Sequence, residues 1–258
     1  MHELYKESYK DLIEFWKSEE KLAKIKGWDF SHLKGRWHDA GNALPWDYKK
    51  IIKAHLKPEM KILDIDTGGG EFVLSLGHDP HNISVTENYE PNFILCKEKL
   101  SPLGITVVKA SASSLPFEDE SFDLILNRHG DLCPKEIFRV LKEDGLFITQ
   151  QVGAYNDREL VRLILPKAKI PFPDQILSTK AAEFESEGFE ILEENEAYHL
   201  IRFYDVGALV WFAKIIEWEF PDFSVNKCKK QLMEAQEIIS DNEVIEGSAH
   251  RFYFVAQK

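Results

Sequence analysis

The chain has little cysteine, with three cysteines in 258 residues. Cys96, Cys133 and Cys228 lie far apart and form no C-x-x-C pair, so the sequence predicts neither a disulfide framework nor a zinc site, and we expect no metal. The first twenty residues lack the apolar stretch of a signal peptide, and the longest apolar run, residues 208–213, is far too short to cross a membrane. We therefore expect a cytoplasmic chain that has no membrane segment.

Positive charge is also scarce. The chain has 32 Lys and Arg against 44 Asp and Glu, so its formal net charge is −12. Nucleic-acid partners are disfavoured, because affinity for phosphate backbones comes from basic side chains. The 44% share of apolar residues excludes a disordered chain. At about 100–200 residues per domain, the length allows one large domain or slightly more.

From Lys61 to about residue 151, short β-rich runs alternate with helical stretches. This alternation predicts a parallel sheet, and strands that are apolar on both faces predict helices on both sides of it. Right-handed crossovers then give a doubly wound, Rossmann-like α/β fold. The expected strands are 61–65, 83–87, 105–110, 122–127 and 145–152, and the expected helices are 71–76, 91–100 and 134–141.

The flanking segments predict two helical additions to this core. In residues 3–26, apolar side chains recur at helical spacing, and a second short helix ends before Pro58, so residues 1–60 are expected to form an N-terminal helical cap. Residues 61–258 would form the main domain, with its core at 61–151 and a helical insertion before the last strand within 152–258. The apolar stripe of the first helix consists of Tyr5, Tyr9, Leu12, Ile13 and Trp16.

A group of aromatic residues in the insertion allows two interpretations. Aromatic faces attract cations and cover flat ligands, so the group could line a substrate site. The insertion must also dock on the sheet through apolar side chains, and we favour this core interpretation. The residues are Phe203, Tyr204, Trp211, Phe212, Trp218 and Phe220.

The segment with the clearest chemistry is a hydrophobic strand that leads into three glycines and a helix. Glycines let the backbone turn tightly and approach a ligand, and the following helix offers unpaired N–H groups, which is typical of a nucleotide site. No Gly-Lys-Ser/Thr sequence follows, which excludes a P-loop. Val73 stands where a dinucleotide fingerprint has its third glycine, so NAD binding is weakened but stays open. The turn comprises Asp64, Asp66, Thr67, Gly68, Gly69 and Gly70.

This turn resembles motif I of the class I S-adenosylmethionine-dependent methyltransferases, in which a strand with a late acidic residue precedes Gly-x-Gly-x-Gly. The resemblance continues in three later segments, in the family's order, and covers residues 61–151. They are the acid Glu87 at the end of the next strand, the stretch ASASSLPFEDESFDLIL at 110–126, and IFRVLKEDGLFITQ at 137–150. The resemblance implies a seven-stranded, mostly parallel sheet and S-adenosyl-L-methionine as the cofactor.

The resemblance also implies roles for individual residues. Asp64 would fix the turn or meet the methionine ammonium, and the turn glycines would admit the cofactor. Glu87, followed by Asn88, would hold the ribose, because a carboxylate can accept from both hydroxyls. Ser111 and Ala112 would contact the adenine, and Asn127 would lie beside the methyl donor.

Two residues depart from the family pattern. Asp66 stands where the family usually has its first glycine, and it could face the cationic ligand itself. Ser111 stands where an aspartate commonly accepts the adenine amino group. His129 follows the fourth strand at the edge where doubly wound sheets bind ligands, and it is our candidate for a general base if the acceptor is a hydroxyl.

These features predict S-adenosylmethionine-dependent methyl transfer to a small or medium-sized acceptor. RNA or protein methylation and a non-catalytic cofactor-binding module are the alternatives, because one fold hosts many functions. A nicotinamide-dependent oxidoreductase is the remaining alternative. The acceptor, the pathway and the oligomeric state are left open.

Overall fold

A computed structural model describes residues 2–24, 29–39 and 44–258, with only the backbone of residues 2–8. The described chain forms two compact units. The first comprises residues 1–44, 154–173 and 198–250, and the second comprises residues 45–153, 174–197 and 251–258. Within the described residues, no helix combines the length and the apolarity that a membrane crossing requires.

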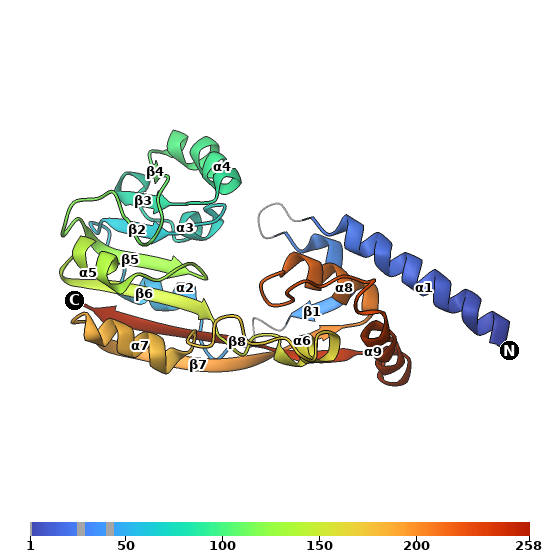
Figure 1. The fold of residues 1–258 in the computed structure, drawn as a ribbon. Coiled ribbons are helices and arrows are strands. Elements are labelled where there is room, and N and C mark those ends of the chain that lie inside the picture. Colours follow the sequence, from blue (N-terminus) through green and yellow to red (C-terminus); the bar gives the residue numbers. More distant parts are fainter. Residues whose placement is uncertain (1, 25–28, 40–43) are drawn as a thin grey trace. The chain divides into compact units, whose positions relative to one another are not determined.

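The second unit contains the predicted α/β core (Figure 1). Its strands are β2 (Ile62–Ile65), β3 (Ile83–Thr86), β4 (Thr106–Val108), β5 (Phe122–Arg128) and β6 (Leu141–Val152), joined by parts of β7 (Glu190–Phe203) and β8 (Ile245–Gln257). Its helices are α2 (Tyr48–His55), α3 (Glu71–Ser75), α4 (Glu90–Leu100), α5 (Pro134–Val140) and α7 (Leu177–Ser186).

The strand order of this unit is β7-β8-β6-β5-β2-β3-β4. Strands β4, β3, β2, β5 and β6 pair in parallel, whereas β8 pairs with β6 in antiparallel orientation. The chain runs outward from β2 to β4 and then returns to the other side of β2 at β5. The sheet therefore has its topological switch point between β2 and β5, and ligands of such sheets bind beyond the carboxyl ends of the strands at that point.

Two apolar layers enclose the parallel strands, as their two-sided hydrophobicity predicts. One layer surrounds Ile62, Val85 and Leu124, and the other surrounds Leu63, Ile125 and Phe147. All six side chains are 2% exposed or less. The carboxyl ends of β2 and β5 are thus held in register, with Ile65 opposite Asn127.

The first unit is mainly helical. It contains α1 (His2–Leu22), β1 (Trp37–Asp39), α6 (Arg158–Ile164), α8 (Val206–Ile215) and α9 (Lys229–Asn242), with the remaining parts of β7 and β8. Ile13 and Trp16 bury the predicted stripe of α1, while Tyr9 is exposed and the side chain of Tyr5 lies outside the described part. The helical insertion before the last strand is present as α8 and α9.

The aromatic group of the insertion divides in two. Phe203, Trp211, Phe212 and Phe220 are at most 5% exposed and belong to the core of the first unit, as the core interpretation predicts. Tyr204 and Trp218 are exposed.

The described sheet has eight strands rather than seven, because β1 adds an edge strand that pairs with β7. The division into a 1–60 cap and a 61–258 domain stays a prediction. In the structure, residues 45–60, including α2, group with the second unit.

Candidate functional site

The glycine turn after β2 has a left-handed backbone at three residues: Asp66 at φ 56°, Gly68 at 65° and Gly70 at 77°. Only glycine adopts such angles without cost, and aspartate tolerates them better than most other residues. A Cβ at Gly70 would lie 2.6 Å from Leu100 Cδ1, whereas a Cβ at Gly68 would have no atom within 4 Å. Packing therefore requires glycine at 70, while Gly68 faces open space that a ligand can enter.

Asp64 lies at the end of β2 and is 3% exposed. Its carboxylate accepts a hydrogen bond of 2.5 Å from the Thr67 hydroxyl, which closes the turn. Burial, together with the neighbouring Asp66 and Glu87 carboxylates, raises the pKa of Asp64 to about 7, although the Thr67 hydroxyl and the Arg128 guanidinium lower it. A cation bound here would relieve this unfavourable charge.

Asp66 connects the turn to the loop after β5. Its Oδ2 accepts from the backbone N–H of Asp131 at 3.1 Å, and a Cβ at Gly130 would lie only 2.7 Å from the Asp66 side chain. Burial, together with the Glu87 and Asp131 carboxylates, raises the pKa of Asp66 to about 6, although the hydrogen bond from the Asp131 N–H lowers it. Asp66, which stands where the family usually has glycine, therefore joins the two loops at the switch point. The sequence did not predict this contact.

Glu87 follows β3 and is 5% exposed. It accepts from the backbone N–H of Gly68 at 3.0 Å and of Tyr89 at 2.9 Å, so it ties the glycine turn to the next loop. The Asn92 amide donates to the same carboxylate at 3.4 Å. A carboxylate has about four acceptor sites, so Glu87 keeps capacity for one further hydroxyl unless a ligand displaces Asn92. Asn88, beside it, is exposed.

Ser111 and Ala112 lie in the loop after β4. The Ser111 hydroxyl lies 3.0 Å from that of Ser113, and its carbonyl accepts from the N–H of Ser114 at 3.0 Å. The Ala112 side chain is 1% exposed and belongs to the core, so only its backbone can face a ligand.

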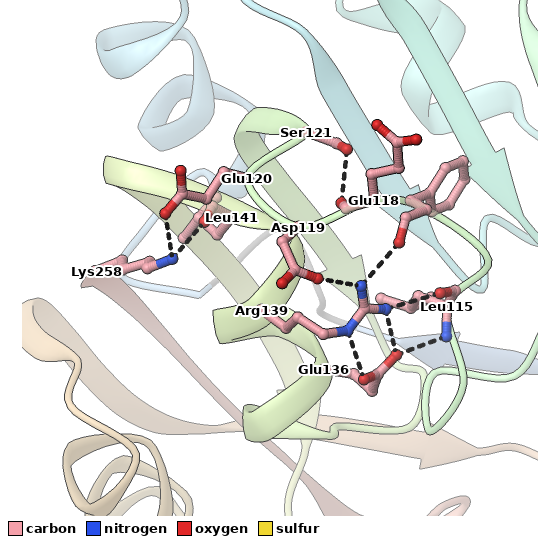
Figure 2. Close-up of polar contacts among 10 residues, drawn as sticks. Leu115, Glu118, Asp119, Glu120, Ser121, Glu136, Arg139, Leu141 and Lys258 are labelled. Carbon is pink, nitrogen blue, oxygen red and sulfur yellow. Dashed lines mark hydrogen bonds and ion pairs between the residues drawn. The ribbon is translucent and has the colours of Figure 1, made fainter.

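Arg139 of α5 fixes the rest of this loop (Figure 2). Its guanidinium donates to the carbonyls of Leu115 and Phe117, each at 2.8 Å, and to Asp119 at 2.9 Å. Glu136 accepts from the same guanidinium at 2.8 and 2.9 Å and from the Leu115 N–H at 2.8 Å. The planar fork of arginine makes such multiple contacts possible, and Arg139 thereby holds the segment that follows Ser111 and Ala112.

Asn127 is fully buried at the end of β5. Its amide donates to the carbonyls of Ile65 at 3.3 Å and Asp131 at 3.2 Å, and its oxygen accepts from the Gln151 amide at 2.6 Å. These contacts give Asn127 a role in positioning the carboxyl ends of β2 and β5.

His129 stands two residues further along, with a left-handed backbone at φ 63°. It is exposed, yet the protein packed around the imidazole lowers its pKa well below the usual range, and the guanidinium groups of Arg251 and Arg128 lower it further. Its Nε2 lies 3.4 Å from the Gln150 amide nitrogen.

Two further residues near the site carried no motif signal. Cys96 is buried on α4, and its thiol donates to the Gly68 carbonyl at 3.0 Å. Trp46 donates through its indole N–H to Gln150 at 2.9 Å. The sequence around Cys96, in a helix, and around Trp46, in a loop, gives no indication that these contacts form.

Comparison with known proteins identifies similar families for the segment that contains most of these residues. Residues 63–149 match the family model described as a methyltransferase domain. The ubiquinone/menaquinone biosynthesis C-methyltransferase UbiE of Shewanella woodyi is 30% identical over 114 residues, covering 39% of this chain and 45% of that protein. The phthiotriol/phenolphthiotriol dimycocerosates methyltransferase of Mycobacterium tuberculosis is 32% identical over 87 residues, covering 31% and 32%. The chain thus spans less than half the length of these curated relatives.

Solved structures share the fold at low sequence identity. YcgJ of Bacillus subtilis has a TM-score of 0.55 at 18% identity, covering 82% of this chain and 97% of that one. BH2331 of Bacillus halodurans C-125 has a TM-score of 0.54 at 18% identity, covering 82% and 98%. The [4+2]-cyclase SpnF has a TM-score of 0.50 at 16% identity, covering 81% and 79%. The predicted Rossmann-like fold and the predicted family resemblance are confirmed, while the roles of the site residues stay predictions.

Proposed function

We propose, from the premise that residues 63–149 form a methyltransferase domain, that this chain catalyses S-adenosylmethionine-dependent methyl transfer to a small-molecule acceptor. The observation that carries the proposal is the group of three carboxylates around the glycine turn. Asp64, Asp66 and Glu87 lie on adjacent strand ends at the switch point, and burial, together with the mutual repulsion of these carboxylates, raises the pKa of Asp64 to about 7 and that of Asp66 to about 6.

The residues of the turn fit a cationic nucleoside ligand. Gly68 offers the open approach, and Asp64 and Asp66 offer negative charge for the methionine ammonium. Glu87 offers its remaining acceptor site to one ribose hydroxyl, and a second hydroxyl would take the place of the Asn92 amide. Ser111 and the backbone of Ala112 would meet the adenine, on a loop that Arg139 holds in place. When bound, S-adenosylmethionine supplies a methyl group activated by the sulfonium, which an acceptor nucleophile attacks in line.

The protein's own contribution is to orient the reactants and exclude water. Well-aligned pairs can gain roughly 7–11 kcal/mol from orientation alone. The buried Asn127 keeps the ends of β2 and β5 in register through its bonds to the Ile65 and Asp131 carbonyls. Because the sulfonium is already an activated electrophile, an acid or base from the protein is optional.

A small-molecule acceptor is favoured over nucleic acid by the net charge of −12. The two curated relatives carry the names of methyltransferases of ubiquinone or menaquinone biosynthesis and of phthiotriol dimycocerosates, which are small molecules rather than RNA or protein.

A calorimetric titration of the full chain with S-adenosylhomocysteine tests the cofactor assignment. We expect saturable heat with one site per chain. Absence of binding at millimolar concentration, for both S-adenosylhomocysteine and S-adenosylmethionine, would disprove the proposal. Binding without a methylated product across a broad panel of acceptors would instead favour the non-catalytic module.

A further inference from the structure

Beyond the cofactor turn, three side chains form a hydrogen-bonded series at the carboxyl ends of β5 and β6. The Trp46 indole N–H donates to Gln150 Oε1 at 2.9 Å, and Gln150 Nε2 lies 3.4 Å from His129 Nε2. Gln150 is 5% exposed, and the Trp46 ring packs against Tyr253 with 4.9 Å between the ring centroids. The amide of Gln150 is therefore held from both sides in a largely dry position.

The chemistry of the partners decides how the Gln150 amide is oriented. An indole N–H can only donate, so the group that faces Trp46 must be the amide oxygen. The opposite orientation would set two donors against each other at 2.9 Å and leave a buried polar group unpaired, which costs about 1–3 kcal/mol. The amide NH₂ group of Gln150 consequently faces His129.

The same reasoning extends to the imidazole. An amide NH₂ can only donate, so His129 Nε2 must accept and therefore carries no proton. Arg128 and Arg251 lie close enough to oppose a second proton on the ring, which would make it positively charged. We propose that Gln150, oriented by Trp46, fixes His129 as the neutral Nδ1–H tautomer, so that His129 donates a hydrogen bond to the methyl acceptor and does not take its proton.

This inference rests on the proposed function and narrows its substrate class. A donor at His129 Nδ1, with two guanidinium groups nearby, suits an acceptor that carries an anionic oxygen, such as a phenolate, an enolate or a carboxylate. A protonated amine would meet like charge at this end of the site. The acceptor would lose its proton to solvent before transfer, because the Nε2 lone pair of His129 is already engaged.

The tautomer can be measured directly on the cofactor-free full chain labelled with ¹⁵N. Long-range ¹H–¹⁵N correlation spectra at neutral pH distinguish the protonated ring nitrogen from the unprotonated one. The chain has nine histidines, and the signals that disappear in His129→Gln identify His129. We expect a protonated Nδ1 and an unprotonated Nε2. A protonated Nε2, or the tautomer mixture of an unrestrained imidazole, would overturn the inference.

Two variants test the cause. Gln150→Glu replaces the donor by a group that only accepts, so the proton should move to Nε2 and the pKa of His129 should rise. Trp46→Phe keeps the ring but removes the N–H that orients the amide, so both tautomers should appear. If His129 keeps the wild-type tautomer in both variants, Gln150 does not control it. Far-UV circular dichroism of each variant checks that the fold is retained.

The proposed function and this inference fail in different measurements. Absence of S-adenosylhomocysteine binding would remove the methyl-transfer role while the tautomer assignment stands on the spectra. Normal binding together with a protonated Nε2 would keep the methyltransferase and overturn the donor role of His129.

Discussion

At the scale of single residues, the glycines of the turn have two different roles: Gly70 is required for packing, whereas Gly68 leaves space for a ligand. Gly68, Gly70 and Gly77 all have a left-handed backbone, with φ of 65°, 77° and 70°, but only at Gly70 would a Cβ meet another side chain. We expect Gly70→Ala to lower the free energy of unfolding by about 2–3 kcal/mol, from strain plus overpacking against Leu100. Gly68→Ala and Gly77→Ala should each cost about 1–2 kcal/mol, from backbone strain alone.

Urea denaturation measures these differences, and calorimetry with S-adenosylhomocysteine separates the roles. Gly77→Ala is the matched control, because it has the same strain and the same open space as Gly68 but lies after α3. Only Gly68→Ala, of these two, should weaken binding. Equal affinity of the two variants would show that the open face of Gly68 does not receive the ligand.

A second prediction at this scale concerns Asp66. An unfolded aspartate titrates at about 3.9, whereas the folded pKa of Asp66 is about 6, so the folded state binds more protons between these values. Stability contributed by this group is therefore highest at low pH and falls as pH rises from about 4 to about 6. At pH 8 the charged carboxylate is destabilising.

Asp66→Asn should remove this penalty. Asparagine tolerates the left-handed backbone and can still accept from Asp131 through its amide oxygen. With a discount for partial exposure, we expect a gain of roughly 1 kcal/mol at pH 8 and about half of that gain at pH 5, which is midway through the titration window. Affinity for S-adenosylmethionine should fall about tenfold at pH 8, because a charge facing the cation is lost. Denaturation and binding at both pH values measure this, and a variant that binds as tightly as wild type would contradict the ligand-facing role.

At the scale of elements, the strands of the core could be predicted because each is a short apolar run between turn signals. The observed bounds of β2, β3 and β5 each differ from the expected bounds by one residue at one end. β1 was missed because its three residues, Trp-His-Asp, carry no alternating pattern and gain their order from pairing with β7. β6 begins at Leu141, four residues before the expected start, because pairing with β5 resumes across a bulge near Phe122.

The loop after β4 shows what sequence spacing cannot supply. The motif located Ser111 and Ala112, but their support comes from Arg139, which lies more than 20 residues away and bonds to Leu115, Phe117, Asp119 and Glu136. A pattern read along the chain gives no indication of these contacts, since they form only when α5 packs beside the loop.

Arg139→Lys tests this support. Lysine keeps the charge but cannot form the five bonds of the planar fork, so we expect a loss of about 2–4 kcal/mol in the free energy of unfolding. Hydrogen exchange at the Leu115 amide should accelerate, and affinity for S-adenosylhomocysteine should weaken. Arg202→Lys is the control, because Arg202 and its partner Glu246 are 41% and 49% exposed, and such pairs contribute little. Similar losses in both variants would refute the supporting role of Arg139.

At the scale of the whole molecule, composition and alternation predicted the α/β core, but not the grouping of the chain into two compact units. The first unit combines three separate stretches of sequence, and its core joins α1 residues such as Trp16 with α8 residues such as Trp211. Such packing depends on the fit between the surfaces of helices that lie far apart in the sequence. No local pattern in a single sequence shows which helices fit together.

This grouping leads to a prediction about the complete chain. Every residue that we assign to the cofactor lies in the second unit. S-adenosylhomocysteine at 100 times its dissociation constant raises the free energy of unfolding of the part of the chain that binds it by about 2.7 kcal/mol. Hydrogen exchange followed by mass spectrometry should therefore show slower exchange in peptides spanning residues 62–70, 86–92 and 111–115. Peptides of α8 and α9, which hold no cofactor residue, should exchange as in the free chain, and slowing confined to those helices would place the nucleoside elsewhere than at the glycine turn.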